Sequence, residues 1–167
     1  MPHAHRAPRD PLTLVPEGSA TDDFADLVGQ SFTAPQVYEV SRGKVREFAE
    51  AVGESSALCF DIDAAQAAGY ADLVAPPTFA VIPAFTGLHE VMARIGAPLQ
   101  QQVHGEQGFV HHRPIVAGDV LVATATAQRI RAVAGNLFVT VACEVTDADG
   151  KPVTTARSVV VVRGSAQ

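Results

Sequence analysis

The stretch Ala75-Pro-Pro-Thr-Phe-Ala-Val-Ile-Pro-Ala-Phe-Thr-Gly-Leu-His-Glu-Val-Met-Ala-Arg-Ile95 decides how this chain folds. Apolar residues recur in it at helical spacing, and no charge interrupts them before Glu90, which predicts one central helix over Ala75–Ile95. Pro77 suits the first turn, whereas Pro83 is expected to kink the helix or to move its start downstream. Other elements must wrap so apolar a helix. The predicted stripe consists of Phe79, Ile82, Phe85, Leu88, Val91, Met92 and Ile95.

The residues after Gly96-Ala-Pro98 have a different composition, typical of β-strands. They are rich in Val, Thr and Phe, and turn signals divide them, which predicts four consecutive strands paired antiparallel in a meander. Apolar residues occur on both faces of the third strand, which suggests that an oligomer covers part of the outer face. The predicted strands are Val103–His112, Val120–Arg131, Leu137–Thr146 and Val153–Arg163.

Shorter elements precede the central helix. Ser41 is a suitable N-cap for one helix, and Asp61 or Asp63 for another. The order strand, helix, short helix, long apolar helix and four strands predicts an α+β hot-dog fold, a curved antiparallel sheet wrapped around a long central helix. The predicted elements before that helix are the strand Gln36–Val40, the helix Arg42–Val52 and the helix Asp63–Ala68.

The composition indicates a globular protein with one domain. Of 167 residues, 47% are hydrophobic, which is enough for a full core over residues 23–167. Residues 1–22 contain four prolines with histidine, arginine, glycine and serine, which predicts a disordered tail.

Charge and cysteine content narrow the class of partner and the compartment. A formal net charge of −6 argues against nucleic acid and against an anionic membrane surface as general partners. The first residues lack the apolar run of a signal peptide, so the cytoplasm is the expected location. Cys59 and Cys143 stand alone, so neither a disulfide framework nor a metal site is expected.

Four motifs occur in an order that resembles the MaoC-like dehydratases, and more closely their FAS1-like N-terminal type, which includes the mycobacterial (3R)-hydroxyacyl-carrier-protein dehydratase subunits. The resemblance covers about Leu27 to Arg163, and its strongest piece is Arg113-Pro-Ile-Val-Ala-Gly-Asp119. The four motifs are Phe48-Ala-Glu-Ala-Val-Gly53, Ala65-Gln-Ala-Ala-Gly-Tyr70, Ala75-Pro-Pro-Thr-Phe79 and His104-Gly-Glu-Gln-Gly-Phe-Val-His-His-Arg-Pro-Ile-Val-Ala-Gly-Asp119.

The resemblance implies reversible hydration of a trans-2-enoyl thioester to the (R)-3-hydroxyacyl thioester. The acyl group would be carried by coenzyme A or by an acyl carrier protein, and no cofactor is expected. A base must activate water, an acid must supply the α-proton, and donors must stabilise the thioester oxygen. In catalytic members of the family, an Asp and a His within Gly-Asp-x-Asn-Pro-x-His transfer the protons, and a glycine amide at the start of the central helix helps to hold the carbonyl.

This chain departs from that pattern at the chemical positions. Glu54 stands for the Asp and Cys59 for the His, and Pro76-Pro77 replaces the His-Gly before the helix. Pro77 has no amide hydrogen to donate. Our first hypothesis is therefore an acyl-thioester-binding subunit of a hydratase or dehydratase that pairs with a second hot-dog chain carrying the intact dyad. The remaining positions of the motif are Gly53 for the glycine, Ser56 for the Asn and Ala57 for the Pro.

Three alternatives stay open. The chain could be a self-sufficient homodimeric hydratase that uses His104 with Glu106, or Glu54, because residues two apart on a strand share a face and a neutral His beside a carboxylate is a reasonable base. It could instead be a non-enzymatic binder of acyl-coenzyme A or acyl carrier protein, or a hot-dog thioesterase.

Several further residues are candidates for contact with the acyl thioester. Arg113, with Arg129 and Arg131, could meet the phosphates of coenzyme A or an acidic carrier protein, or could lie on a solvated sheet edge. The candidate substrate-binding residues are Cys59, Tyr70, Pro77, Thr78, Phe79 and Arg113.

Three histidines and one aspartate have expected structural positions. His111 and His112 should point to opposite faces of a strand, one buried and one exposed, and therefore form no two-ligand metal site. His89 should lie in the core, and Asp119 should bond backbone amides in a tight turn.

Overall fold

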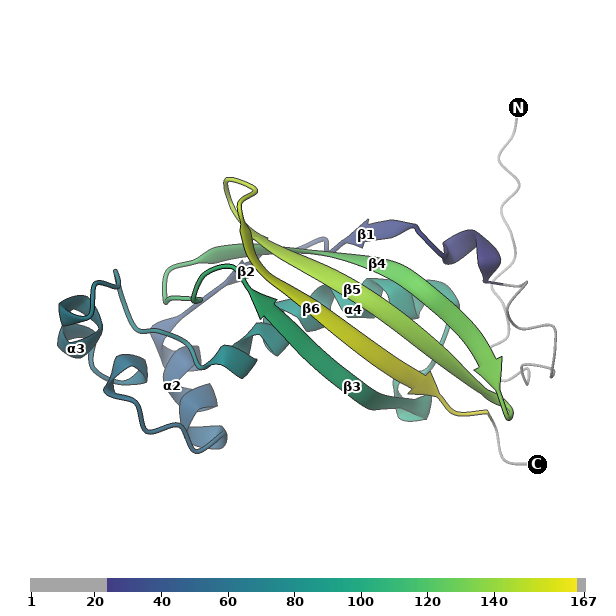
Figure 1. The fold of residues 1–167 in the computed structure, drawn as a ribbon, viewed down its shortest axis with the longest axis horizontal. Coiled ribbons are helices and arrows are strands. Elements are labelled where there is room, and N and C mark those ends of the chain that lie inside the picture. The colour runs from purple at the N-terminus through teal and green to yellow at the C-terminus, as the bar shows by residue number, and fades with distance from the viewer. Residues whose placement is uncertain (1–23, 165–167) are drawn as a thin grey trace.

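The computed structural model describes residues 24–164, so the predicted tail, residues 1–22, lies outside the described part. Within it, six strands form one antiparallel sheet in the order β1-β4-β5-β6-β3, and β2 also pairs with β4 (Figure 1). This is the predicted α+β hot-dog arrangement, because the curved sheet lies across one long helix. The strands are β1 (Ser31–Thr33), β2 (Tyr38–Glu39), β3 (Gln102–His111), β4 (Val120–Val133), β5 (Asn136–Asp147) and β6 (Pro152–Val162).

The central helix starts later than the apolar pattern predicts. A single 3₁₀ turn, Pro77–Ala80, leads into α4 (Val81–Ile95). Of the two effects expected from Pro83, a kink or a later start of the helix, the later start is confirmed. Pro77 is the first residue of the 3₁₀ turn, as predicted. Pro83 lies in the first turn of α4, where a missing N–H leaves no helical hydrogen bond unmade. Gly96 ends α4 with a φ of 76°, in the left-handed region that favours glycine.

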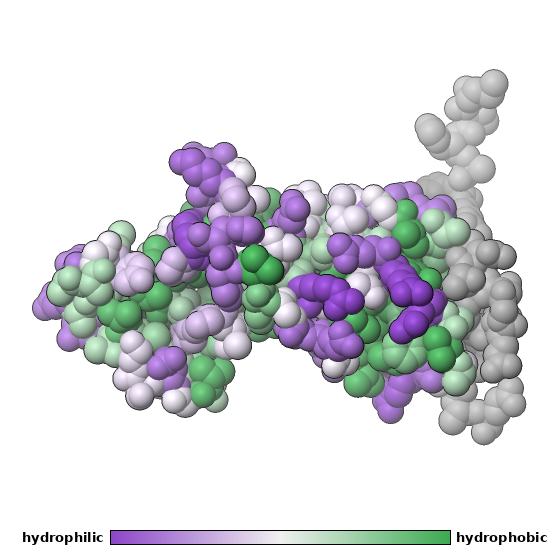
Figure 2. All heavy atoms as spheres, viewed as in Figure 1, coloured by the Kyte–Doolittle hydropathy of each residue, from purple (hydrophilic) through white to green (hydrophobic). Residues whose placement is uncertain are grey.

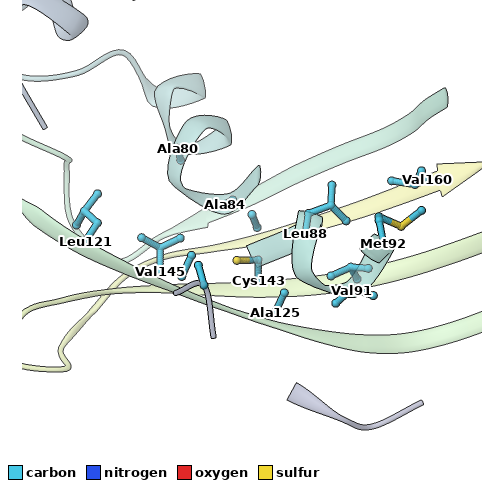
Figure 3. Close-up of a cluster of buried hydrophobic side chains, with 14 of the residues drawn as sticks. Ala80, Ala84, Leu88, Val91, Met92, Leu121, Ala125, Cys143, Val145 and Val160 are labelled. Carbon is cyan, nitrogen blue, oxygen red and sulfur yellow. The ribbon is translucent and has the colours of Figure 1, made fainter. Parts of the chain in front are cut away.

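The helix α4 packs on β4 and β5 through one side only. Leu88, Val91 and Met92 are buried against the strands (Figure 3). Phe85, by contrast, is 44% exposed, and the prediction that His89 lies in the core is wrong because its side chain is also exposed. A single helix on one face of a sheet leaves its far side uncovered, however apolar the sequence is.

The predicted four-stranded meander is wrong at one strand. β4, β5 and β6 follow one another as neighbours, but β3 pairs with β6 rather than with β4. The chain between β3 and β4 must therefore run from the edge of the sheet formed by β3 past β6 and β5 to β4. As a result, the second edge of β3 has no partner strand among residues 24–164.

The helices α2 (Arg42–Ala51) and α3 (Ile62–Ala67) lie beyond the end of the sheet, whereas β1 and β2 pair with β4 within it (Figure 1). The predicted caps are confirmed: the Ser41 hydroxyl accepts from Lys44 N at the start of α2, and Asp61 accepts from Asp63 N at the start of α3. The predicted strand Gln36–Val40 is shorter than expected, because only β2 pairs, and β1 was not predicted. No helix in the described part is long and apolar enough to cross a membrane.

Gly87 fixes how closely α4 approaches the sheet. A Cβ at this position would lie 2.9 Å from Cys143 Sγ and 3.2 Å from Ala125 Cβ. We expect Gly87→Ala to lower the free energy of unfolding by about 1–3 kcal/mol, because the core has no room for the added methyl group. Urea unfolding followed by circular dichroism measures this change.

Gly43→Ala is the matched control. Gly43 lies in α2, and the nearest atom to its added Cβ is Ser41 Oγ at 4.0 Å. This substitution should leave stability unchanged or raise it by up to about 1 kcal/mol, the usual preference of a helix for alanine. Equal effects at the two glycines would contradict the close approach of α4.

Candidate active site

A pocket of about 430 Å³ lies between the end of β3 and the chain that leads into the central helix. Apolar side chains form much of its lining, among them Leu58, Val74 and Ile115. Of the predicted site residues, Glu54, Cys59, Pro77 and Arg113 line it. His104, Glu106, Tyr70, Thr78 and Phe79 are not among its lining residues.

Phe79 and Tyr70 have other surroundings. Phe79 is fully buried and makes edge-to-face contacts with Tyr38 and Phe48, at ring-centroid distances of 6.2 and 5.4 Å. It therefore anchors α2 and β2 to the start of the central helix. Tyr70 is half-buried and its backbone N–H bonds Ala65 O at the end of α3.

The resemblance sets Glu54 at the position of the family's Asp, and in the structure its carboxylate holds the local backbone. Its Oε1 accepts from Ser55 N and Ser56 N, both at 2.8 Å. Ser56 in turn caps the 3₁₀ turn Ala57–Cys59 by accepting from Leu58 N. The carboxylate therefore orders the loop that forms one wall of the pocket.

Cys59 is only 4% exposed, although it lines the pocket. Burial raises the pKa of its thiol, and the nearby Glu54 carboxylate raises it further. The thiol therefore stays protonated at neutral pH and supplies neither a base nor a nucleophile.

Pro76 and Pro77, which the resemblance sets at the family's His-Gly, leave these two positions at the start of the central helix without an amide donor. Both Pro76 and Pro77 line the pocket, and neither has an amide hydrogen. The amides just before them are already used: Val74 N donates to Leu58 O and Ala75 N to Ile115 O, both at 2.9 Å.

The predicted pairing of His104 with Glu106 is wrong. The register of β3 shifts between them, so His104 lies opposite Val160 while Glu106 lies opposite Val159, and their side chains are on different faces of the sheet. His104 Nε2 bonds Gln107 Oε1 at 2.9 Å, and Glu106 pairs with Arg157 at 3.2 Å. A bulge at Gly105 inserts one residue and reverses the alternation. A glycine inside a strand was the available signal.

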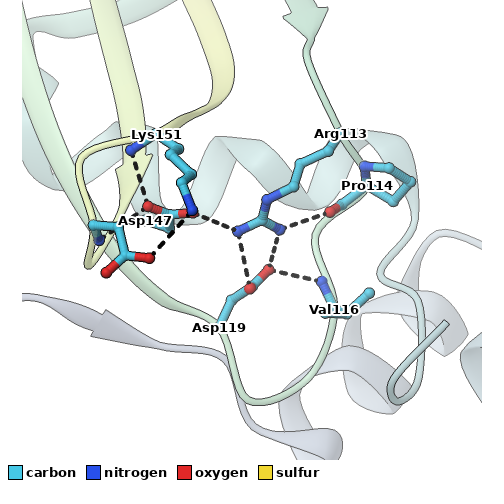
Figure 4. Close-up of polar contacts among 7 residues, drawn as sticks. Arg113, Pro114, Val116, Asp119, Asp147 and Lys151 are labelled. Carbon is cyan, nitrogen blue, oxygen red and sulfur yellow. Dashed lines mark hydrogen bonds and ion pairs between the residues drawn. The ribbon is translucent and has the colours of Figure 1, made fainter.

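Arg113 is engaged by carboxylates of its own chain (Figure 4). Its guanidinium donates to both oxygens of Asp119, at 2.7 and 3.0 Å, and lies 3.6 Å from Asp147 Oδ2. Asp119 also accepts from Val116 N at 3.0 Å, which confirms its predicted turn role. The Lys151 backbone amide, with a smaller contribution from Arg113, lowers the pKa of Asp147. This network ties the crossover after β3 to the turn between β5 and β6.

His111 and His112 were not predicted as pocket residues, yet both line the pocket. Both are exposed, so the expectation that one is buried is wrong; β3 ends at His111, on the open edge of the sheet. His111 Nδ1 lies 3.2 Å from Thr154 Oγ1, and His112 Nε2 lies 3.1 Å from Thr155 Oγ1. Among residues 24–164, no group of three or more His, Cys, Asp or Glu side chains could hold a metal ion.

The raised pKa of Cys59 can be tested by thiol labelling. In the Cys143→Ala variant, where Cys59 is the one remaining thiol, dithiodipyridine should react at pH 7 at least about tenfold more slowly than in the urea-unfolded chain, because less thiolate is present at a given pH. The labelling rate should rise only above the pH range of an ordinary thiol. Rapid labelling of the folded variant at pH 7 would instead indicate an activated thiolate and would make Cys59 a candidate nucleophile.

Comparison with known proteins adds to this geometry. Residues 26–156 match the family described as "FAS1-like, dehydratase domain region". A UPF0336 protein of Saccharopolyspora erythraea is 45% identical over 143 residues, which is 84% of this chain and 92% of the relative. A UPF0336 protein of Streptomyces avermitilis is 43% identical over 141 residues, covering 83% and 94% of the two chains.

Solved structures share the fold. A chain of the HadBC (3R-hydroxyacyl-ACP dehydratase) complex of Mycobacterium tuberculosis superposes with a TM-score of 0.74 at 31% identity, covering 81% of this chain and 97% of that one. An (R)-hydratase of A. caviae has the same fold, with a TM-score of 0.63 at 17% identity and coverage of 80% and 94%. The motifs, the fold and the family match over residues 26–156 agree. The chain therefore belongs to the FAS1-like dehydratase domain family, among the MaoC-like hot-dog proteins.

Proposed function

We propose that this chain is the acyl-thioester-binding subunit of an (R)-specific enoyl-thioester hydratase or 3-hydroxyacyl-thioester dehydratase, and that a second hot-dog chain supplies the catalytic dyad. One observation carries the proposal: a largely apolar pocket is lined by the residues that the resemblance sets at the family's catalytic positions, but Glu54 is a backbone cap there and Cys59 a buried thiol.

The chemistry of hydration supports the proposal of a second chain. Water must lose a proton as it attacks the β-carbon, the α-carbon must gain one, and the thioester oxygen must be stabilised as negative charge develops on it. A protonated thiol and two prolines perform none of these steps. The apolar lining, in contrast, suits an acyl chain, and the pocket volume of about 430 Å³ falls in the usual range for a ligand site.

The comparisons support a paired assembly. A relative at 31% identity was solved as a two-component dehydratase complex. The homodimeric alternative that relies on His104 with Glu106 loses its geometric basis, because the two side chains lie on different faces of β3.

Substitution in the native complex tests the proposal. The complex is purified through a tag on this chain and assayed with enoyl thioesters of several lengths. Glu54→Gln should leave kcat within about twofold, because no proton passes through this carboxylate. Leu58→Trp should raise KM for long chains about tenfold with little change in kcat, because it narrows the acyl pocket.

Glu50→Gln, at an exposed position of α2, is the charge control for Glu54→Gln. A fall in kcat of about 100-fold or more in Glu54→Gln alone would mean that this chain takes part in proton transfer, and it would overturn the non-catalytic role.

The uncovered side of α4 is the surface we assign to the partner chain. Phe85 is 44% exposed there, although the sequence places it in the apolar stripe. Phe85→Asp should weaken the complex at least about tenfold, because burial of a phenylalanine contributes about 1.5–3 kcal/mol. Size-exclusion chromatography with light scattering measures the loss.

Val133→Asp is the matched control, since Val133 is 45% exposed at the far end of β4. Equal dissociation by both substitutions would show that the face of α4 is not the interface.

A further inference from the structure

The face of the sheet that is turned away from α4 carries a second hollow, of about 390 Å³. Figure 2 shows this face, where strongly hydrophilic side chains gather over the long strands beside hydrophobic ones. Strand register places Arg129, Thr140, Val159 and Glu106 in one row across β4, β5, β6 and β3. The next row continues with Arg131, Phe138 and Val161, and Arg157 lies on the other side of the first row.

Two of the three arginines that line this hollow, Arg129 and Arg131, are not paired with a carboxylate of the described chain. Arg157 pairs with Glu106 at 3.2 Å. Within residues 24–164, Arg129 and Arg131 form no ion pair, and the Arg131 guanidinium lies 5.5 Å over the Phe138 ring. In a chain with a formal net charge of −6, this hollow is therefore a local basic site.

Two bulges shape the hollow. The register of β4 shifts between Ala127 and Arg129, and that of β3 shifts between His104 and Glu106. Gln128 and Gly105, the residues at these shifts, both line the hollow. Each bulge adds a residue and bends its strand. Because the bulges in β4 and β3 both adjoin the row that contains Arg129 and Glu106, the sheet bends at that row in both strands.

The side chains match one ligand chemistry. A guanidinium presents paired N–H donors that fit the oxygens of a phosphate, and residues two apart on one strand face lie about 7 Å from each other, close to the reach of a diphosphate. The Thr140 hydroxyl adds a neutral donor, and Val159 and Val161 offer an apolar floor beside the arginines.

We propose that this hollow, which we call the outer arginine site, binds a small ligand with a diphosphate group, either inorganic pyrophosphate or a nucleoside diphosphate. The ligand occupies the face of the sheet opposite α4 and contacts no residue of the acyl pocket, so the site is independent of the function proposed above.

Isothermal titration calorimetry of the full chain tests the outer arginine site, with inorganic pyrophosphate and adenosine diphosphate as separate probes at physiological salt. The double variant Arg129→Ala/Arg131→Ala should weaken binding at least about 100-fold, since each charge-assisted contact is worth about tenfold or more. The Arg129→Lys/Arg131→Lys variant should lose part of the affinity for the diphosphate, because an ammonium group keeps the positive charge but lacks the paired N–H donors of a guanidinium. If adenosine diphosphate binds more tightly than pyrophosphate, the ligand of the site is a nucleoside diphosphate. If the two probes bind equally, the ligand is inorganic pyrophosphate.

Arg94→Ala is the matched control. The Arg94 guanidinium lies 5.0 Å over the Phe32 ring, so this variant removes the same charge and the same type of ring contact at another place. It should change binding less than about twofold. Absence of heat from both probes, unchanged binding in the double alanine variant, or an equal loss in Arg94→Ala would each overturn the proposal.

Discussion

The close packing of one apolar helix on the sheet is the constraint on which this structure depends. α4 buries Leu88, Val91 and Met92, and Gly87 lets its backbone approach Ala125 and Cys143. Burial also raises the pKa of the Cys143 thiol to about 12, so that thiol acts as an uncharged core side chain. Because this contact fixes where α4 lies, it also fixes the place where the chain enters it. The candidate active site is built around that entry.

The scaffold of the candidate site is held by contacts within the described chain. Arg113, Asp119 and Asp147 hold the crossover after β3, and Glu54 orders the opposite wall through two backbone amides. The Glu54 carboxylate has this structural role whether or not the site needs a base. Pro77 likewise begins the 3₁₀ turn that leads into α4 but has no amide hydrogen to donate to a ligand.

Features set by local sequence could be predicted, and features set by distant contacts could not. The caps at Ser41 and Asp61 and the start at Pro77 depend on neighbouring residues, and the structure confirms all three. The pairing of β3 with β6 depends on a crossover whose direction no local signal gives. The separation of His104 from Glu106 depends on a single bulged residue, and the place of His111 and His112 in the pocket depends on where β3 ends.

The most direct test of the central claim is a mass-spectrometric measurement on the isolated chain. The chain is incubated with an equimolar amount of a trans-2-enoyl thioester in water labelled with heavy oxygen. The mass of the recovered thioester is then measured. A subunit that binds the acyl group but performs no proton transfer should return it without heavy oxygen. Recovery of the hydroxyacyl thioester with heavy oxygen on its β-carbon, at an enzymatic rate, would show that this chain catalyses the reaction alone and would contradict the account.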